Sequence, residues 1–149
     1  SQVGTGNFGM EIESKSVDNA FWPKITNITL KRAVGTVTEG GSSAAEYDAI
    51  QFKKQGNGDF SNIVISGYTT SGATAVRIQD AATNTDQVNG HKIKLTNVKI
   101  NDGTPQYTGA IGVTVLFADA DYTLSSEATG AAITAGDWTI VEGVNLLLN

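Results

Sequence analysis

The chain repeats one short pattern three times at a fixed interval. The segments are ITNITL, FSNIVI and LTNVKI, which start at residues 25, 60 and 95, so both intervals are 35 residues. A second pattern, a small residue followed by apolar-x-apolar, alternates with the first at GMEI (9–12), AIQF (49–52), AVRI (75–78) and AIGV (110–113). Both patterns alternate apolar with polar residues, which is the period of a half-buried strand.

Constant strands joined by loops of unequal length are typical of a solenoid. We therefore predict an all-β fold, a right-handed parallel β-helix of about four to five coils with an apolar C-terminal cap. Strands of successive coils would lie about 4.8 Å apart and pair through their backbone N–H and C=O groups. We expect a single domain over residues 1–149, with the coils in 1–117 and a C-terminal coil or cap in 118–149.

The repeated asparagines interrupt the strand alternation. With strict alternation Ile28 would face the core and Ile25 would face water, unless the chain bends at Asn27. Asparagine enters the left-handed backbone region more readily than other non-glycine residues, so a bend there is favourable. We therefore expect Asn27, Asn62 and Asn97 to stack at one corner as a hydrogen-bonded ladder.

Charge and composition exclude several classes of function. The net charge is −5 with scattered acidic and basic residues, which disfavours nucleic acid as a partner. No apolar run approaches the roughly 18 residues of a membrane span. The absence of cysteine excludes disulfides, thiolate metal sites and a cysteine nucleophile.

The outward positions of the small-apolar pattern predict one exterior column of Glu11, Gln51, Arg77 and Gly112. Polysaccharide lyases and hydrolases with a β-helix fold place acidic clusters with a lysine or arginine on one sheet face. One carboxylate, one amide, one guanidinium and a bare backbone make a poor catalytic set. His91 is the only histidine and lies beside a glycine turn, so a solvated loop position is expected. We predict no catalytic residue.

Two sets of residues are candidates for ligand binding. Tyr47, Tyr68 and Tyr107 lie beside turns and could offer rings to glycans, although rings packed against the loop bases are the alternative. Asp119 and Asp121 form an Asp-x-Asp pair that could bind Ca²⁺, with a plain polar turn as the alternative. No other cofactor is expected.

The stretch DAIQFKKQGNGDFSNIVISGYTTSGATAVRIQD (48–80) resembles bacterial secreted or surface-lipoprotein right-handed β-helix proteins, which belong to the pectate-lyase-like superfold. FWPKITNITL (21–30) and TAGDWT (134–139) are similar to further parts of that family. The resemblance implies an extracellular or Gram-negative cell-envelope setting and carries over no catalytic residue. Members carry more coils, which implies that this chain is the C-terminal part of a longer one.

The expected function follows from this architecture. An uncovered strand edge at the N-terminal end would bind further coils or another subunit. We expect a non-enzymatic stalk, adhesin or assembly module of a cell-surface protein, with glycans as candidate ligands. The alternatives are a carbohydrate-active β-helix fragment, or a pilin-like β-sandwich with VNLLLN (144–149) as a donor strand.

Overall fold

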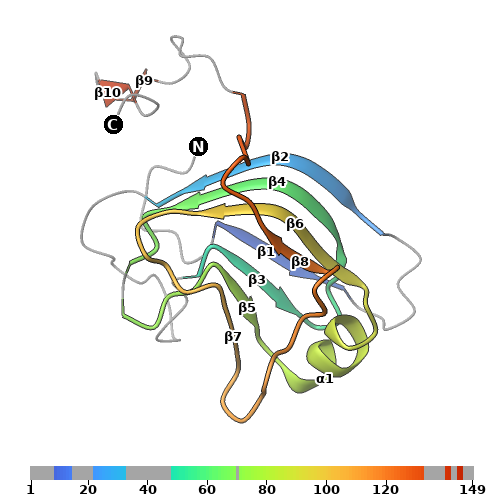
Figure 1. The fold of residues 1–149 in the computed structure, drawn as a ribbon. Helices are drawn as coiled ribbons and strands as arrows, with labels where there is room; N and C mark the ends of the chain where they lie inside the picture. The colour runs from blue at the N-terminus through green and yellow to red at the C-terminus, as the bar shows by residue number, and fades with distance from the viewer. Residues whose placement is uncertain are drawn as a thin grey trace.

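The computed structural model of the protein describes residues 9–14, 22–32, 48–69, 71–132, 140–141 and 144–145. Two four-stranded sheets face each other (Figure 1). The first sheet contains, in order, β1 (Met10–Glu13), β3 (Ile50–Lys53), β5 (Val76–Ile78) and β7 (Tyr107–Gly109). The second contains, in order, β2 (Lys24–Lys31), β4 (Gly58–Ser66), β6 (Ile93–Ile100) and β8 (Tyr122–Leu124).

Every strand pair within these two sheets is parallel, and each strand pairs with the strand two strands later in the chain. The chain therefore alternates between the sheets and completes one coil with every two strands. The predicted parallel β-helix is confirmed. The β-sandwich alternative is wrong, because such sandwiches are built from antiparallel sheets.

Residues that are 35 positions apart lie opposite each other in β2, β4 and β6 of the second sheet. Ile25 lies opposite Phe60 and Phe60 opposite Leu95, while Ile28, Ile63 and Val98 form the next row. Phe60, Leu95 and Ile63 are fully buried, whereas Ile25 in the outermost coil keeps 39% of its surface exposed. The apolar rows therefore enclose the core between the sheets, and the first coil leaves part of its row uncovered.

The core is filled from both sheets. Phe52 of the first sheet packs edge-to-face on Phe60 of the second, with ring centroids 5.5 Å apart and an interplanar angle of 72°. Burying one such large apolar side chain stabilises the fold by about 1.5–3 kcal/mol. Other fully buried aliphatic side chains of the core include Ile50, Ile63, Ile65, Val76, Ile78, Val88, Ile93 and Leu95.

The three repeated asparagines meet at the corner where the second sheet bends. Their φ angles are 61° at Asn27, 53° at Asn62 and 56° at Asn97, all in the left-handed region. Asn62 Nδ2 donates to Asn27 Oδ1 at 2.7 Å, and Asn97 Nδ2 donates to Asn62 Oδ1 at 3.4 Å. The left-handed residue bends each strand so that the apolar residues on both sides of it face the core.

The fourth coil continues the corner without an asparagine. The register between β6 and β8 shifts between Leu95 and Val98, because β8 spans the corner with one residue fewer. Thr123 lies at the corner of β8, and its Oγ1 accepts a hydrogen bond from Asn97 N at 2.9 Å. A threonine hydroxyl therefore ends the asparagine column at this side.

The chain after β8 runs back across the outer side of the second sheet (Figure 1). Asn62 Oδ1 accepts from the backbone N–H of Thr129 at 2.8 Å and of Gly130 at 3.2 Å, and Ala131 N donates to Thr29 Oγ1 at 2.9 Å. The described part, 125–132, packs along the outside of the coils. Most of the apolar segment that the sequence predicts as a C-terminal cap lies outside the described residues. Beyond it the structure describes an antiparallel pair, β9 (Ile140–Val141) and β10 (Val144–Asn145).

The last strand of the first sheet differs from the prediction. AIGV (110–113) was expected to form it, but β7 is Tyr107–Gly109, and Ile111 is fully exposed. The N–H groups of Ala75 and Val76 donate to the C=O groups of Pro105 and Gln106 at 2.8 and 3.0 Å. These bonds place Tyr107 beside Val76. Gly112, with φ 79°, therefore lies in a turn and not in the exterior column.

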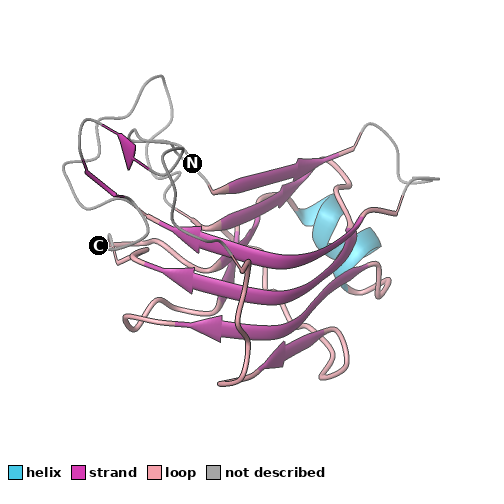
Figure 2. Cartoon of the chain, turned by 90° about the horizontal axis from the view of Figure 1, so that it is seen from above, coloured by secondary structure: helices cyan, strands magenta, loops and turns pink. Residues whose placement is uncertain are grey.

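A short helical segment connects β5 to β6 at one end of the strands (Figure 2). It consists of α1 (Ala81–Thr83) and the π-helical turn η1 (Asn84–Val88). Asp80 caps α1 by accepting a hydrogen bond from Thr83 N at 2.8 Å. Neither helical element of the described chain has the length and apolar character to cross a bilayer.

Candidate functional site

The outer face of the first sheet carries charged and polar side chains that the coils align into rows. Because β1, β3 and β5 alternate, their apolar residues face the core, and Glu11, Gln51 and Arg77 face outward in register. Thr108 of β7 takes the fourth place in this column. The second outward row begins with Glu13 and Lys53. We call these two rows, together with Asp48 and Gln79, the outer polar face.

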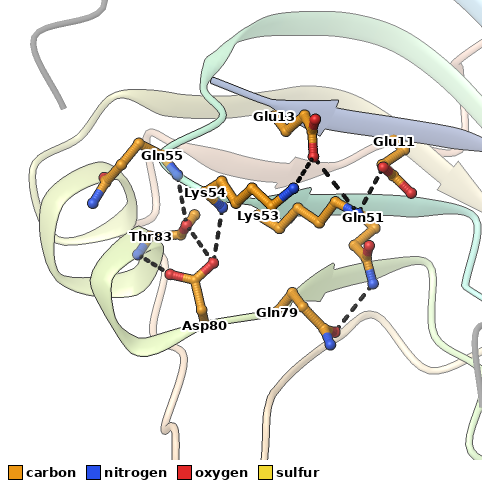
Figure 3. A network of polar contacts seen from close by, with 9 residues as sticks. All are labelled: Glu11, Glu13, Gln51, Lys53, Lys54, Gln55, Gln79, Asp80 and Thr83. Carbon is orange, nitrogen blue, oxygen red and sulfur yellow. Dashed lines mark hydrogen bonds and ion pairs between the residues drawn. The ribbon is translucent and has the colours of Figure 1, made fainter. Parts of the chain in front are cut away.

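The upper part of the outer polar face is a set of ion pairs between coils (Figure 3). Lys53 Nζ lies 2.7 Å from Glu11 Oε1 and 3.6 Å from Glu13 Oε2. Lys54 Nζ lies 3.1 Å from Glu13 Oε2. The hydrogen bond to Glu11 raises the pKa of Lys53, and the hydrogen bond from Lys54 lowers the pKa of Glu13. Each charge therefore has a partner in the neighbouring coil.

The lower part of the outer polar face centres on Arg77. Gln79 Oε1 accepts from Arg77 Nε at 2.8 Å and from Gln51 Nε2 at 3.1 Å. Arg77 Nε also lies 3.9 Å from Asp48 Oδ2. These contacts join an acid, a guanidinium and two amides over two successive coils, and Asp48 is a member that the sequence pattern did not indicate.

Asp48 is a buried acid at the start of β3. The residue is 1% exposed, and its Oδ1 accepts from Thr74 N at 2.7 Å and from Thr74 Oγ1 at 2.9 Å. Burial raises the pKa of Asp48, an effect that the bonds from Thr74 and the charge of Arg77 oppose. Asp48 Oδ2 and Gln51 Oε1 are buried acceptors without a hydrogen-bond donor in the described part of the chain. They are the two sites on this face that an added donor could use.

A third group of polar contacts fixes the helical segment to the turn after β3. Asp80 Oδ2 accepts from Lys54 N at 2.9 Å, and Thr83 Oγ1 accepts from Gln55 N at 3.0 Å. Burial alone would raise the pKa of Asp80, but the hydrogen bonds from the backbone N–H groups of Thr83 and Lys54 hold it below its ordinary value. Lys54 and Gln55 both have positive φ, so these bonds stabilise a turn that non-glycine residues rarely adopt.

The tyrosines predicted to bind glycans lie in different environments. Tyr68 is 4% exposed, and Arg32 lies over its ring at 5.7 Å. Tyr107 packs edge-to-face against Phe117 and Tyr122 at 5.2 and 5.1 Å. Tyr47 lies outside the described residues. Glycan binding by an exposed row of these rings therefore does not fit Tyr68, and for Tyr47 and Tyr107 it stays a prediction.

The two residues of the predicted Asp-x-Asp pair differ in exposure. Asp119 is exposed, whereas Asp121 is buried, with its Oδ2 2.6 Å from His91 Nδ1. His91 has φ 58° in the turn before β6, so the contact joins that turn to the one before β8. Among the described residues, no three or more acidic or histidine side chains gather where they could hold a metal ion. Ca²⁺ binding by Asp119 and Asp121 stays a prediction.

The His91–Asp121 pair is a feature that sequence reasoning missed. The two residues are 30 positions apart, and no motif relates them. The pair therefore ties the turn before β6 to the turn before β8.

Comparison with known proteins agrees with this architecture. The profile described as "Pectate-lyase like beta helix domain" matches residues 1–141. The chain belongs to this family. No curated protein and no solved structure gave a significant match. The family assignment agrees with the parallel β-helix fold of the structure.

One prediction concerns the pH dependence of Asp48. A raised pKa means that the folded chain binds a proton at this carboxyl more tightly than the unfolded chain does. Its contribution to stability is therefore largest below the ordinary pKa of 3.8 and falls as pH rises through the raised value. Asp48→Asn removes this titration while keeping an oxygen for Thr74. We therefore expect the free energy of unfolding of Asp48→Asn, relative to that of wild type, to increase as the pH is raised from about 3 to about 7.

The measurement is urea unfolding at both pH values, taken as the difference between variant and wild type. Glu13 and Asp80, whose pKa values are lowered, titrate in the opposite sense and cancel in that difference. Asp48→Ala serves as the control, because it leaves Thr74 without its acceptor and should cost about 1–3 kcal/mol. A constant difference between Asp48→Asn and wild type over this pH range would contradict the prediction.

Proposed function

We propose that this chain is a non-enzymatic, rigid β-helix module of an extracellular or cell-surface protein, acting as a stalk, adhesin or assembly unit. One observation carries the proposal: the side chains of the outer polar face are directed at one another between coils. Glu11 and Glu13 pair with Lys53 of the next coil, and Gln51 donates to Gln79 of the coil after that. Side chains that satisfy each other contribute to stacking the coils and are poorly placed to act on a substrate.

Assembly is supported by the strands at the N-terminal end of the solenoid. β1 and β2 are edge strands of their sheets, and Ile25 on β2 is 39% exposed. An edge strand presents unpaired backbone groups that can continue a sheet. We propose that further coils or another subunit pair with this edge. A position within a longer extracellular chain agrees with the family's pectate-lyase-like fold.

Carbohydrate chemistry is the second candidate, favoured by Asp48 and Arg77. A buried acid with a raised pKa beside a guanidinium is a common arrangement for proton transfer. The two buried acceptors, Asp48 Oδ2 and Gln51 Oε1, would suit the hydroxyl groups of a sugar. Both residues are about 1% exposed, which counts against direct contact with a glycan at the surface.

The deciding experiment is a degradation assay on polyuronates with and without Ca²⁺, together with glycan-array binding. We expect no turnover by the wild-type chain. Turnover that disappears in Arg77→Gln, Glu11→Gln or Asp48→Asn, and persists in the control Lys24→Gln, would establish the carbohydrate-active alternative. Lys24 is exposed on the other sheet, with only a 4.0 Å contact to Asp59.

A further inference from the structure

The first coil ends the core in an apolar surface that spans both sheets. Met10 and Ile12 of β1 and Leu30 of β2 are half-buried, and Ile25 of β2 is 39% exposed. Their register partners in the second coil, which are Ile50, Phe52, Ile65 and Phe60, are all fully buried. Trp22, just before β2, is also 39% exposed. We call these five first-coil residues the apolar end.

The chain that follows the last coil runs to the apolar end. It crosses β6 and β4 on the outer side of the second sheet and reaches β2 (Figure 1). On β4, Asn62 Oδ1 accepts from Thr129 N at 2.8 Å, and on β2, Thr29 Oγ1 accepts from Ala131 N at 2.9 Å. Gly130 lies so close to Thr29 that an added Cβ would collide with its hydroxyl. Because β2 is the edge strand, the chain arrives beside the first coil.

The C-terminal segment, residues 133–149, is long enough and apolar enough to cover this end. An extended chain spans about 3.3 Å per residue, whereas facing sheets lie about 10 Å apart. Within the segment β9 and β10 pair with each other and with no other described strand. A two-stranded hairpin alone is only marginally stable in water, so it needs an apolar surface to pack on. The large apolar residues of the segment are Ile133, Trp138, Ile140, Val141, Val144, Leu146, Leu147 and Leu148.

We propose that the C-terminal segment packs on the apolar end of its own chain and covers it. The solenoid is then closed at the first coil by the part of the sequence that follows the last one. Both ends of a solenoid need such a cover, because an open coil exposes core residues and strand edges to water. The strap of residues 125–132 carries the segment past three strands to reach this position.

The charges around β2 favour the same occupant. The C-terminal segment contains Asp137 and Glu142 and no basic residue. Lys24 and Lys31 are exposed at the two ends of β2, and the Lys24 ammonium has only a 4.0 Å contact with Asp59 among the described residues. An acidic segment on a basic strand edge has complementary charge.

The last coil suits the acidic segment less well. Asp119 and Glu127 are exposed there and would repel it. The acidic residues of the first coil, Glu11 and Glu13, already pair with Lys53. To reach the last coil, the segment would also have to turn back over the strands that the strap has just crossed.

Docking of the C-terminal segment has a consequence for assembly. The edge that it would cover is the one at which we propose that further coils or another subunit pair. Such a partner would have to displace the segment before it could bind. The inference goes beyond the proposed function and does not rest on it, because a carbohydrate-active chain could carry the same cover.

The first test uses tryptophan fluorescence of the full chain. Trp22 and Trp138 are the only tryptophans, so Trp22→Phe leaves Trp138 as the sole reporter on the C-terminal segment. In this background we expect Ile25→Glu to raise the acrylamide quenching constant of Trp138 about twofold or more. The matched control Leu124→Glu places the same charge on a 51% exposed residue of the last coil and should leave the constant unchanged. No effect of Ile25→Glu, or an effect of Leu124→Glu as large or larger, would overturn the proposal.

The second test places the segment directly, since the chain has no native cysteine. Asn145→Cys is combined with Ile25→Cys in one variant and with Leu124→Cys in the other, and both are equilibrated in a glutathione buffer. We expect the oxidised-to-reduced ratio of the 25/145 pair to exceed that of the 124/145 pair by about tenfold or more, because docking raises the effective concentration of the two thiols. Equal ratios, or a higher ratio for 124/145, would contradict docking on the first coil. Disulfides between two copies, which non-reducing electrophoresis separates by mass, would contradict docking within one chain.

Discussion

Asn62→Leu should lower the free energy of unfolding by about 3–5 kcal/mol, because it removes several hydrogen bonds and places a leucine at a left-handed backbone position. The Asn62 amide donates to Asn27 at 2.7 Å, and its Oδ1 accepts from Thr129 N at 2.8 Å. It also accepts from Asn97 Nδ2 at 3.4 Å. The middle asparagine thus joins three coils and the returning C-terminal segment.

Two control variants separate these causes. Asn62→Gly removes the amide but accepts φ 53° without steric cost, so it should lose about 1–2 kcal/mol less than Asn62→Leu. Asn27→Leu removes an end member, which receives one described amide bond from its neighbour, and should be milder than Asn62→Leu. Urea unfolding measures all three variants. Equal losses at Asn27 and Asn62 would show that the column contributes no more at its centre than at its end.

Phe60→Ala should cost about 3–5 kcal/mol, because it leaves a cavity between the two sheets. Phe60 is fully buried, and its ring contacts Phe52 across the core. The lost stabilisation combines the transfer of the ring from water with the contacts that its neighbours can no longer make. We expect urea unfolding to shift to a much lower midpoint, with a slope close to that of wild type.

Ile111→Ala is the matched control for Phe60→Ala. Ile111 is fully exposed in the turn after β7, so its truncation should change stability by less than about 0.5 kcal/mol. A large loss at Ile111 would mean that the turn is covered in solution. A loss below about 1 kcal/mol at Phe60 would contradict a core shared by both sheets.

The coil architecture was predictable because its determinants are local and periodic. The 35-residue interval fixes which residues stack, and asparagine is one of the few side chains that tolerate the left-handed corner. Both features are visible without coordinates. The exterior column of Glu11, Gln51 and Arg77 follows from the same alternation and is confirmed by the register of β1, β3 and β5.

The differences arise where the repeat ends. AIGV has the same pattern as the true strands, but backbone bonds to Pro105 and Gln106 place β7 three residues earlier. The returning segment has no period, and its contact with Asn62 depends on long-range packing. Asp48 comes immediately before a strand pattern, and nothing local indicates that Arg77 of the next coil lies beside it.

Paired cysteines would test the parallel stacking most directly, because the chain contains no native cysteine. Thr26, Ser61 and Thr96 are register partners in three successive coils. Neighbouring coils lie about 4.8 Å apart, within disulfide range, whereas positions two coils apart are separated by about 9.6 Å and exceed the limit of about 7 Å. We predict that the cysteine pairs 26/61 and 61/96 form intramolecular disulfides in the folded chain and that 26/96 does not. Efficient closure of 26/96, or failure of both neighbouring pairs in a folded chain, would contradict the coil-on-coil architecture.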